Sequence, residues 1–317
     1  MRAPSRSRLV LVVAALALVA AAPLPEWQSP LSREHPLVGT VWDVATGGAL
    51  SPEALVARLA ARRYVLLGEK HDNADHHRLQ AWIVRELITA GRRPAVAFEM
   101  FRADQADAIA RHLAAAPGDA RGLGDALDWR RSGWPAWSMY EPIADAALRA
   151  RLPLVAANLS DTTTGALRRG GVAALDPGAI ARLGFDRPLP DDVRQRIATE
   201  IKDGHCGQLP EHAVESFVAI QRARDAHMAA VLREAGGDGA ILIAGVGHVR
   251  RDVGVPRALP ERDVASLALL EVRAEMTAPP ALYSDTRLGR IARPAVASRI
   301  RAITGALCPV RSSRSVT

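Results

Sequence analysis

Four apolar runs of this chain end on side chains that could do chemistry. The run 65–67 stops at Gly68 and is followed at once by Glu69 and His71. Three later runs end in the same way on a carboxylate, an amide and an imidazole: Glu99, Asn158 and His248. Ligands of open α/β sheets bind outside the carboxyl ends of the strands, so we expect these side chains to share one edge of a parallel sheet.

Two carboxylates and two imidazoles at one edge suit a metal-dependent hydrolase. Glu69, His71, Glu99 and His248 are the candidate catalytic residues, with His71 and His248 as candidate ligands of a divalent metal ion. One of the four would activate water while the others hold the metal, which needs an open coordination position. For any one of these residues alone, a structural hydrogen bond is the simpler explanation, whereas their convergence favours a functional site.

Aromatic residues form a second signal. Trp134, Trp137 and Tyr140 are spaced three apart, so they share a side of an expected helix. One interpretation is ordinary core packing. The other is a flat apolar wall for a large planar ligand, with the phenol of Tyr140 as a ligand of ferric iron.

The expected helix 211–235 and a nearby loop add three more candidates. Gln221 and Asp225 interrupt the apolar face of the helix, and polar groups inside an apolar stripe need partners. They either pair locally with neighbouring arginines or point into the cleft. His205 lies in a loop, where we interpret it as a contact of a lid.

Alternating strands and helices place these residues in an α/β fold. The expected strands end near residues 67, 98, 157, 244 and 272, and the sequence between the first two reads as an amphipathic helix over 75–90. This alternation predicts right-handed crossovers and a central parallel sheet flanked by helices. Residues 160–210, rich in Gly, Pro and charge, are expected to form an inserted helical lobe.

The ends of the chain differ from this domain, which we expect over residues 51–273. Residues 1–22 have a positive start, an apolar run and small residues for cleavage, which predicts a secretory signal peptide and export to the periplasm or cell envelope. Residues 23–50 are an expected extended lead-in, and the tail 274–317 has no assigned role. The cleavage zone has no lipoprotein cysteine. Cys206 and Cys308 could pair after export or stay as free thiols.

The charge of the chain leaves its ligand open. The formal net charge is +7 over 317 residues, and nearly all basic residues are arginines. This balance suits an acidic ligand or an anionic membrane surface, and it also follows from heavy use of arginine throughout. No basic helix stripe, zinc-finger spacing or aromatic ribonucleoprotein motif is present, so we expect no nucleic-acid partner. Two glycines with no third, in 245–247, argue against a nucleotide cofactor.

Taken together, these motifs resemble the ChaN-like haem-binding uptake family of the Tiki superfamily. The matching segments come in the family order and cover roughly residues 60–260: 67–72, 98–101 with Gln105, 137–142, 156–159, 204–207, 221–229 and 244–250. The resemblance implies an α/β fold like that of ChaN and the erythromycin esterases. It also implies haem as cofactor and ligand, a role in iron acquisition, a homodimer in which haems stack face to face, and Tyr140 as the iron ligand.

The resemblance leaves two functions open. The first is an exported haem-binding protein in which Trp134, Trp137, Asn158, Gln221, Asp225 and His205 line the haem site. The second is a metal-dependent protease or esterase, because the same superfamily holds enzymes that use the Glu and His residues at the strand ends. Unlike the haem-uptake members, the sequence has no lipoprotein cysteine for a lipid anchor. Any association with the membrane is therefore expected to be peripheral.

Overall fold

A twisted sheet forms the centre of the molecule. The computed structural model describes residues 21–205, 207–274, 276–277 and 291–295. Five strands of the sheet run parallel in the order β7, β3, β6, β4, β5. Their bounds are Tyr64–Glu69 for β3, Ala95–Arg102 for β4, Leu154–Asn158 for β5, Ala240–Gly245 for β6 and Val264–Leu270 for β7. The predicted α/β class with a central parallel sheet is confirmed.

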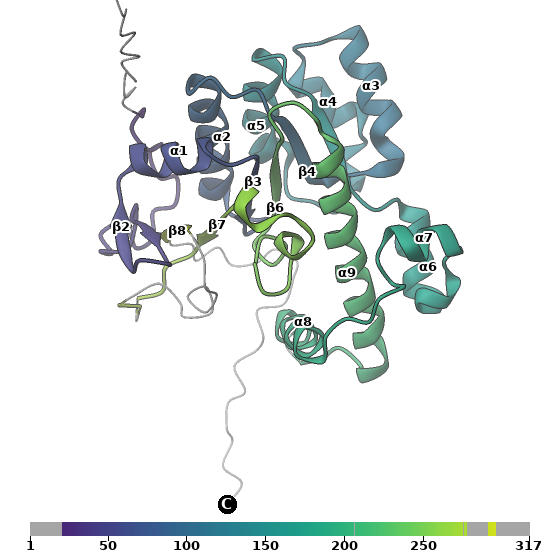
Figure 1. Ribbon diagram of the computed structural model, residues 1–317. Helices are drawn as coiled ribbons and strands as arrows, with labels where there is room; N and C mark the ends of the chain where they lie inside the picture. Colours follow the sequence, from purple (N-terminus) through teal and green to yellow (C-terminus); the bar gives the residue numbers. More distant parts are fainter. Residues whose placement is uncertain (1–20, 206, 275, 278–290, 296–317) are drawn as a thin grey trace, which may run out of the picture.

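Helices cover both faces of this sheet (Figure 1). One face packs against α1 (Pro52–Ala60), α2 (Ala74–Thr89) and α5 (Trp137–Arg149), with α3 (Ala106–Ala115) and α4 (Ala120–Ala126) beside them. The other face packs against the long helix α9 (Glu211–Glu234), whose Met228 and Leu232 contact Leu66 and Leu242 of the strands. The strands are buried on both faces, which explains why they read as continuous apolar runs.

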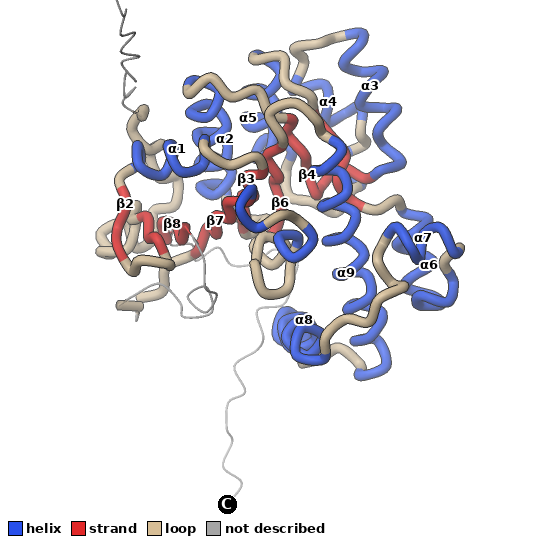
Figure 2. Tube along the Cα trace, viewed as in Figure 1, coloured by secondary structure: helices blue, strands red, loops and turns tan. Residues whose placement is uncertain are grey.

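The inserted lobe is helical, as expected. It consists of α6 (Asp161–Gly170), α7 (Pro177–Arg182) and α8 (Asp191–Gly204), which precede α9 in the chain. Two small apolar clusters attach these helices to the N-terminal half of α9. Figure 2 shows α8 lying crosswise near that end of α9, away from α6 and α7. Because α9 also covers the sheet, it joins the lobe to the strand ends.

The register aligns the strand ends that carry the candidate residues. Glu69 of β3 pairs with Gly245 of β6, so both strands finish at the same level. Gly68 is required here, because a Cβ atom would come within 2.3 Å of the Val249 side chain and 3.0 Å of the Val246 backbone. The β6 strand lies between β3 and β4, which brings residues from three chain segments to one edge.

The sheet extends beyond residues 51–273 at both ends. Within the expected lead-in, β1 (Val41–Asp43) and β2 (Gly48–Leu50) form an antiparallel pair. Within the unassigned tail, β8 (Ile291–Ala295) lies between β1 and β7. These three strands are only three to five residues long, which is too short to give a clear periodicity in the sequence.

Several expectations fall outside the described residues. They are most of the predicted signal peptide, residues 1–20, and both cysteines, Cys206 and Cys308. Among the helices that the structure describes, none is long and apolar enough to cross a membrane.

Candidate functional site

A cavity of about 770 Å³ opens at the carboxyl edge of the parallel strands. We call it the rim cavity. Its floor is formed by the ends of β3, β4, β6 and β7. Its walls are formed by α8 of the lobe and by α9. The lining includes the predicted residues Glu69, His71, Glu99, Gln221 and His248. The structure therefore brings Glu69, His71, Glu99 and His248 of the predicted strand-end residues together, with Gln221 of α9 beside them.

Glu69 and His71 form a carboxylate–imidazole pair in this cavity. The Nδ1 atom of His71 lies 2.7 Å from Oε1 of the buried Glu69 carboxylate. Behind them His77 is fully buried, and its Nε2 atom lies 2.9 Å from the carbonyl oxygen of His71. Gln80 fixes the His77 ring from the other side through a contact of 3.2 Å. The His71 side chain is 34% exposed, so it is the imidazole of this group that reaches solvent.

His248 instead lies between two carboxylates. Its Nε2 atom is 3.3 Å from Oε1 of Glu99, and its Nδ1 atom is 2.6 Å from Oδ1 of Asp225. The backbone N–H of Gly245 donates a 2.7 Å hydrogen bond to Oε2 of Glu99. Gln221 adds its side-chain amide 3.1 Å from Nδ1 of His248. All ring nitrogens of His248 are thus engaged within the protein.

Charge pairing sets the protonation of these groups. Burial alone would lower the pKa of His248, but the charges of Glu99 and Asp225 raise it to about 10. Burial acts to raise the pKa of Glu99, whereas the protonated His248 and the Gly245 N–H hold that pKa well below its usual range. At Asp225 burial dominates and the pKa is raised. The main ion pair of His248 is therefore the one with Glu99.

His71 has the same balance with more solvent around it. Burial would lower the pKa of His71, but its hydrogen bond to Glu69 and the charges of Glu69 and Glu99 raise it. Its Nε2 atom lies 4.0 Å from Oε2 of Glu99. Such an imidazole, oriented by a carboxylate at one nitrogen, can accept a proton or bind a metal at the other.

The carboxylates and imidazoles mostly bind one another instead of forming a cage for a metal ion. Within the described part of the chain, no group of three or more His, Cys, Asp or Glu side chains is arranged to hold one. His248 cannot offer a lone pair, because both of its nitrogens lie within hydrogen-bonding distance of carboxylates, at 3.3 Å and 2.6 Å. The geometry therefore gives the predicted divalent-metal site of His71 and His248 no support.

The predicted aromatic wall packs against the core, and only its Tyr140 is fully buried. The aromatic cluster, which we define as Phe101, Trp129, Trp137 and Tyr140, has ring centroids 4.8–6.2 Å apart for its contacting pairs. The indole of Trp137 donates a 3.0 Å hydrogen bond to the carbonyl of Ala120. Of the predicted wall, Trp134 comes nearest the rim, with its ring 4.8 Å from that of His71.

Tyr140 is fully buried in this cluster. Its hydroxyl lies 3.5 Å from the carbonyl oxygen of His71, behind the rim. Burial, together with the charges of Glu69 and Glu99, raises the pKa of Tyr140 well above its ordinary value. A tyrosinate ligand needs the opposite conditions, so the predicted role of Tyr140 would require α5 to move. That role stays a prediction.

The other predicted residues divide into two groups. Gln221 and Asp225 point toward the cleft through His248, which favours the functional alternative for them. Asn158 does not line the rim cavity, and its side-chain oxygen accepts a hydrogen bond from the Leu159 N–H. His205 is exposed at the end of α8, outside the cavity lining, with its ring against Phe217.

Some cavity residues were missed from the sequence. Arg224, Ile197 and Ile201 come from helix faces whose partners the sequence does not show. Glu271 could have been predicted from the sequence, because it lies directly after the strand β7, just as Glu69 lies at the end of β3. The expected strand ran on to residue 272, whereas β7 ends at Leu270. Lys70 forms ion pairs with Glu271 and Asp72 at the mouth of the cavity.

The fold and the rim cavity define a parallel α/β domain with a ligand site walled by a helical lobe. Residues 55–259 match the family model described as haem-binding uptake, Tiki superfamily, ChaN. This match spans more than half of the chain, and the protein belongs to this family.

One solved structure of those found shares the fold of this chain. The chain is similar to the structure described as cofacial heme binding to ChaN of Campylobacter jejuni, with a TM-score of 0.61 and 21% sequence identity over 80% of this chain and 95% of that chain. A weaker similarity is found to a mutant of the erythromycin esterase EreC in its open conformation, with a TM-score of 0.42 and 15% identity over 73% of this chain and 77% of that chain. No curated protein matches the chain.

Proposed function

We propose that this protein binds haem in the rim cavity. Membership of the haem-binding uptake family supports haem as the ligand. The observation that carries the proposal is the rim cavity itself, in which an exposed imidazole backed by a carboxylate meets aliphatic walls. Its volume of about 770 Å³ lies within the range of about 300–1,000 Å³ that ligand pockets have.

The cavity lining fits haem in three respects. Aliphatic side chains from α8 and β7 offer the apolar contact that a porphyrin ring needs: Ile197, Ile201, Leu269 and Leu270. Arginines reach the cavity and suit the haem carboxylates. His71 has its Nδ1 side held by Glu69, which is how metal-binding histidines are usually oriented. The buried Oε2 atom of Glu69, which has no hydrogen-bond partner, adds negative charge behind this imidazole.

We assign the iron-binding role to Nε2 of His71. Haem bound there would supply an iron centre for storage or transfer, and the residues of this chain would hold it and limit access of water. We further propose that the protein is exported to the cell envelope and takes part in iron acquisition. The predicted signal peptide supports this role. N-terminal sequencing of the protein from a periplasmic fraction tests the export step, and a chain that still carries residues 1–20 there would contradict cleavage.

Titration with ferric haem, followed by absorbance, tests the proposed site. Ile201→Arg puts a charge on the wall of the rim cavity, and we expect it to remove tight binding. The matched control is Val231→Arg, which puts the same charge in a second apolar groove of about 580 Å³ between α3, β5 and α9. Binding that survives Ile201→Arg but fails in Val231→Arg would place haem in that groove and contradict the proposal.

The geometry does not favour the alternative of a metal-dependent hydrolase. In that alternative, one of Glu69, His71, Glu99 and His248 activates water and the others hold a metal ion, whereas His248 is enclosed by Glu99 and Asp225. We therefore do not advance it as a second function.

A further inference from the structure

Among the cations that line the rim cavity, Arg224 is half-buried and forms no ion pair within the described residues. Arg224 lies on α9, one turn from Gln221, and its side chain contributes to the cavity wall. Its Nε atom is shielded from solvent and has no hydrogen-bond partner. Within the part of the chain that the structure describes, Arg224 forms neither a hydrogen bond nor an ion pair, which is unusual for a half-buried guanidinium.

The nearby acids do not fill this role because they have other partners. Asp225, the next residue, binds Nδ1 of His248 at 2.6 Å. Glu99 is occupied by His248 and by the Gly245 N–H. Lys70, another cation of the cavity, differs because it is paired with acidic groups at the cavity mouth. Arg224 therefore lines the cavity with a guanidinium that none of these acids pairs.

A guanidinium with free donors selects a planar anion. Its fork of N–H groups matches the two oxygens of a carboxylate, which it binds through two parallel hydrogen bonds. The aliphatic side chains of the lining offer no such partner to an anionic group: Ile197, Ile201, Leu269 and Leu270. A ligand that carries both an apolar body and a carboxylate would thus be oriented with the carboxylate at α9.

We propose that Arg224 is the carboxylate anchor of the rim cavity and binds a propionate of haem. This inference rests on the proposed function, because it names how the same site would orient its ligand. It separates two tasks within the cavity. His71 binds the iron, and Arg224 fixes the rotation of the porphyrin by holding one of its acidic edges.

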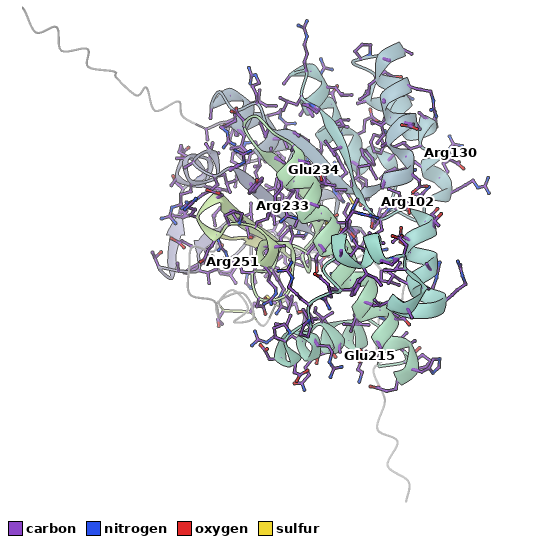
Figure 3. The ribbon with its side chains drawn as sticks, turned by 45° about the vertical axis from the view of Figure 1, so that its right-hand side comes forward. Arg102, Arg130, Glu215, Arg233, Glu234 and Arg251 are labelled. Carbon is purple, nitrogen blue, oxygen red and sulfur yellow. The ribbon has the colours of Figure 1, made fainter. Side chains whose placement is uncertain are left out.

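The experiment compares haem with haem dimethyl ester, in which both carboxylates are blocked. Each is titrated into the wild type, Arg224→Gln and Arg233→Gln. Arg233 is the matched control, because it is exposed at the far end of the same helix (Figure 3). Loss of a charged hydrogen-bonded pair should weaken haem binding by about 10- to 100-fold in Arg224→Gln. Binding of the ester should stay within about threefold of the wild type, and Arg233→Gln should change neither.

Two results would overturn the inference while leaving the proposed function intact. One is haem binding by Arg224→Gln that equals the wild type. The other is equal weakening of haem and of its ester, which would indicate a general disturbance of the cavity. If Arg224→Gln does not fold, Arg224→Lys replaces it, since the ammonium keeps the charge but loses the paired donors. A wild type that binds neither porphyrin would overturn the proposed function, and this inference with it.

Discussion

The rim cavity and the aromatic cluster lie on either side of His71 and differ in what their polar groups have left to bind. In the rim cavity, His71 is partly exposed and the Nε donor of Arg224 has no hydrogen-bond partner. In the aromatic cluster, the indoles of Trp129 and Trp137 donate to backbone carbonyls, and Tyr140 is buried. The comparison teaches that aromatic spacing on a helix identifies a shared face, whereas unsatisfied polar groups identify where a ligand belongs.

The largest effect is expected on stability, when the positive charge of His248 between the two buried carboxylates is removed. His248→Ala would remove the buried cation between Glu99 and Asp225, and we expect it to lower the free energy of unfolding by about 3–5 kcal/mol. Gln221→Ala is the matched control, because it contacts the same ring nitrogen without carrying charge, and it should cost about 1 kcal/mol or less. Urea unfolding measures both, and equal losses would contradict the charge pairing.

The loss of stability in His248→Ala should depend on pH, because the pKa of His248 is raised and that of Glu99 is lowered in the folded protein. Because the pKa of His248 is raised to about 10, its contribution is complete below its unfolded value near 6.5 and disappears as the pH rises through about 10. The lowered pKa of Glu99 makes its contribution complete above its ordinary value of 4.5 and lost in acid. The gap between wild type and His248→Ala should therefore be largest near pH 5–6.5. A gap that grows above pH 10 would contradict the assignment.

The next effect concerns the orientation of His71. Glu69→Gln keeps the shape of the side chain but removes the charge behind the imidazole, and we expect haem affinity to fall by about 10- to 100-fold. Absorbance titration measures it. If haem is bound by the aromatic cluster instead, this variant should bind haem as the wild type does.

Haem affinity should also fall as the pH is lowered, by about tenfold per pH unit, because the iron and a proton compete for Nε2 of His71. Since Glu69 raises the pKa of His71, the fall should begin above pH 6.5, the ordinary value. In Glu69→Gln the same fall should begin at a lower pH. Affinity that is independent of pH in both proteins would argue against an imidazole ligand.

The smallest effect is expected in the aromatic cluster. Tyr140→Phe removes a hydroxyl with one long contact of 3.5 Å, so stability should change by less than about 1.5 kcal/mol. Haem affinity should not change, because the hydroxyl does not face the cavity. A large loss of haem binding in this variant would favour the prediction made from the sequence over the geometry.

Much of the fold could be predicted from the sequence because buried parallel strands are apolar throughout and end abruptly. The run before Gly68 indicates β3, and the same rule places Glu69, Glu99 and His248 at one edge. What could not be predicted depends on partners distant in the chain. The sequence around Arg224 does not show that its neighbour Asp225 is already paired with His248. The sequence around Tyr140 likewise does not show that its hydroxyl is buried behind His71.

The most direct test of the account is the spectrum of the ferric haem complex in the wild type, in His71→Gly, and in His71→Gly with added imidazole. We predict that the spectrum of a histidine-bound iron disappears in His71→Gly and returns when imidazole fills the space that the side chain left. A spectrum that His71→Gly leaves unchanged, and that Tyr140→Phe abolishes, would contradict the assignment of the iron to the rim cavity.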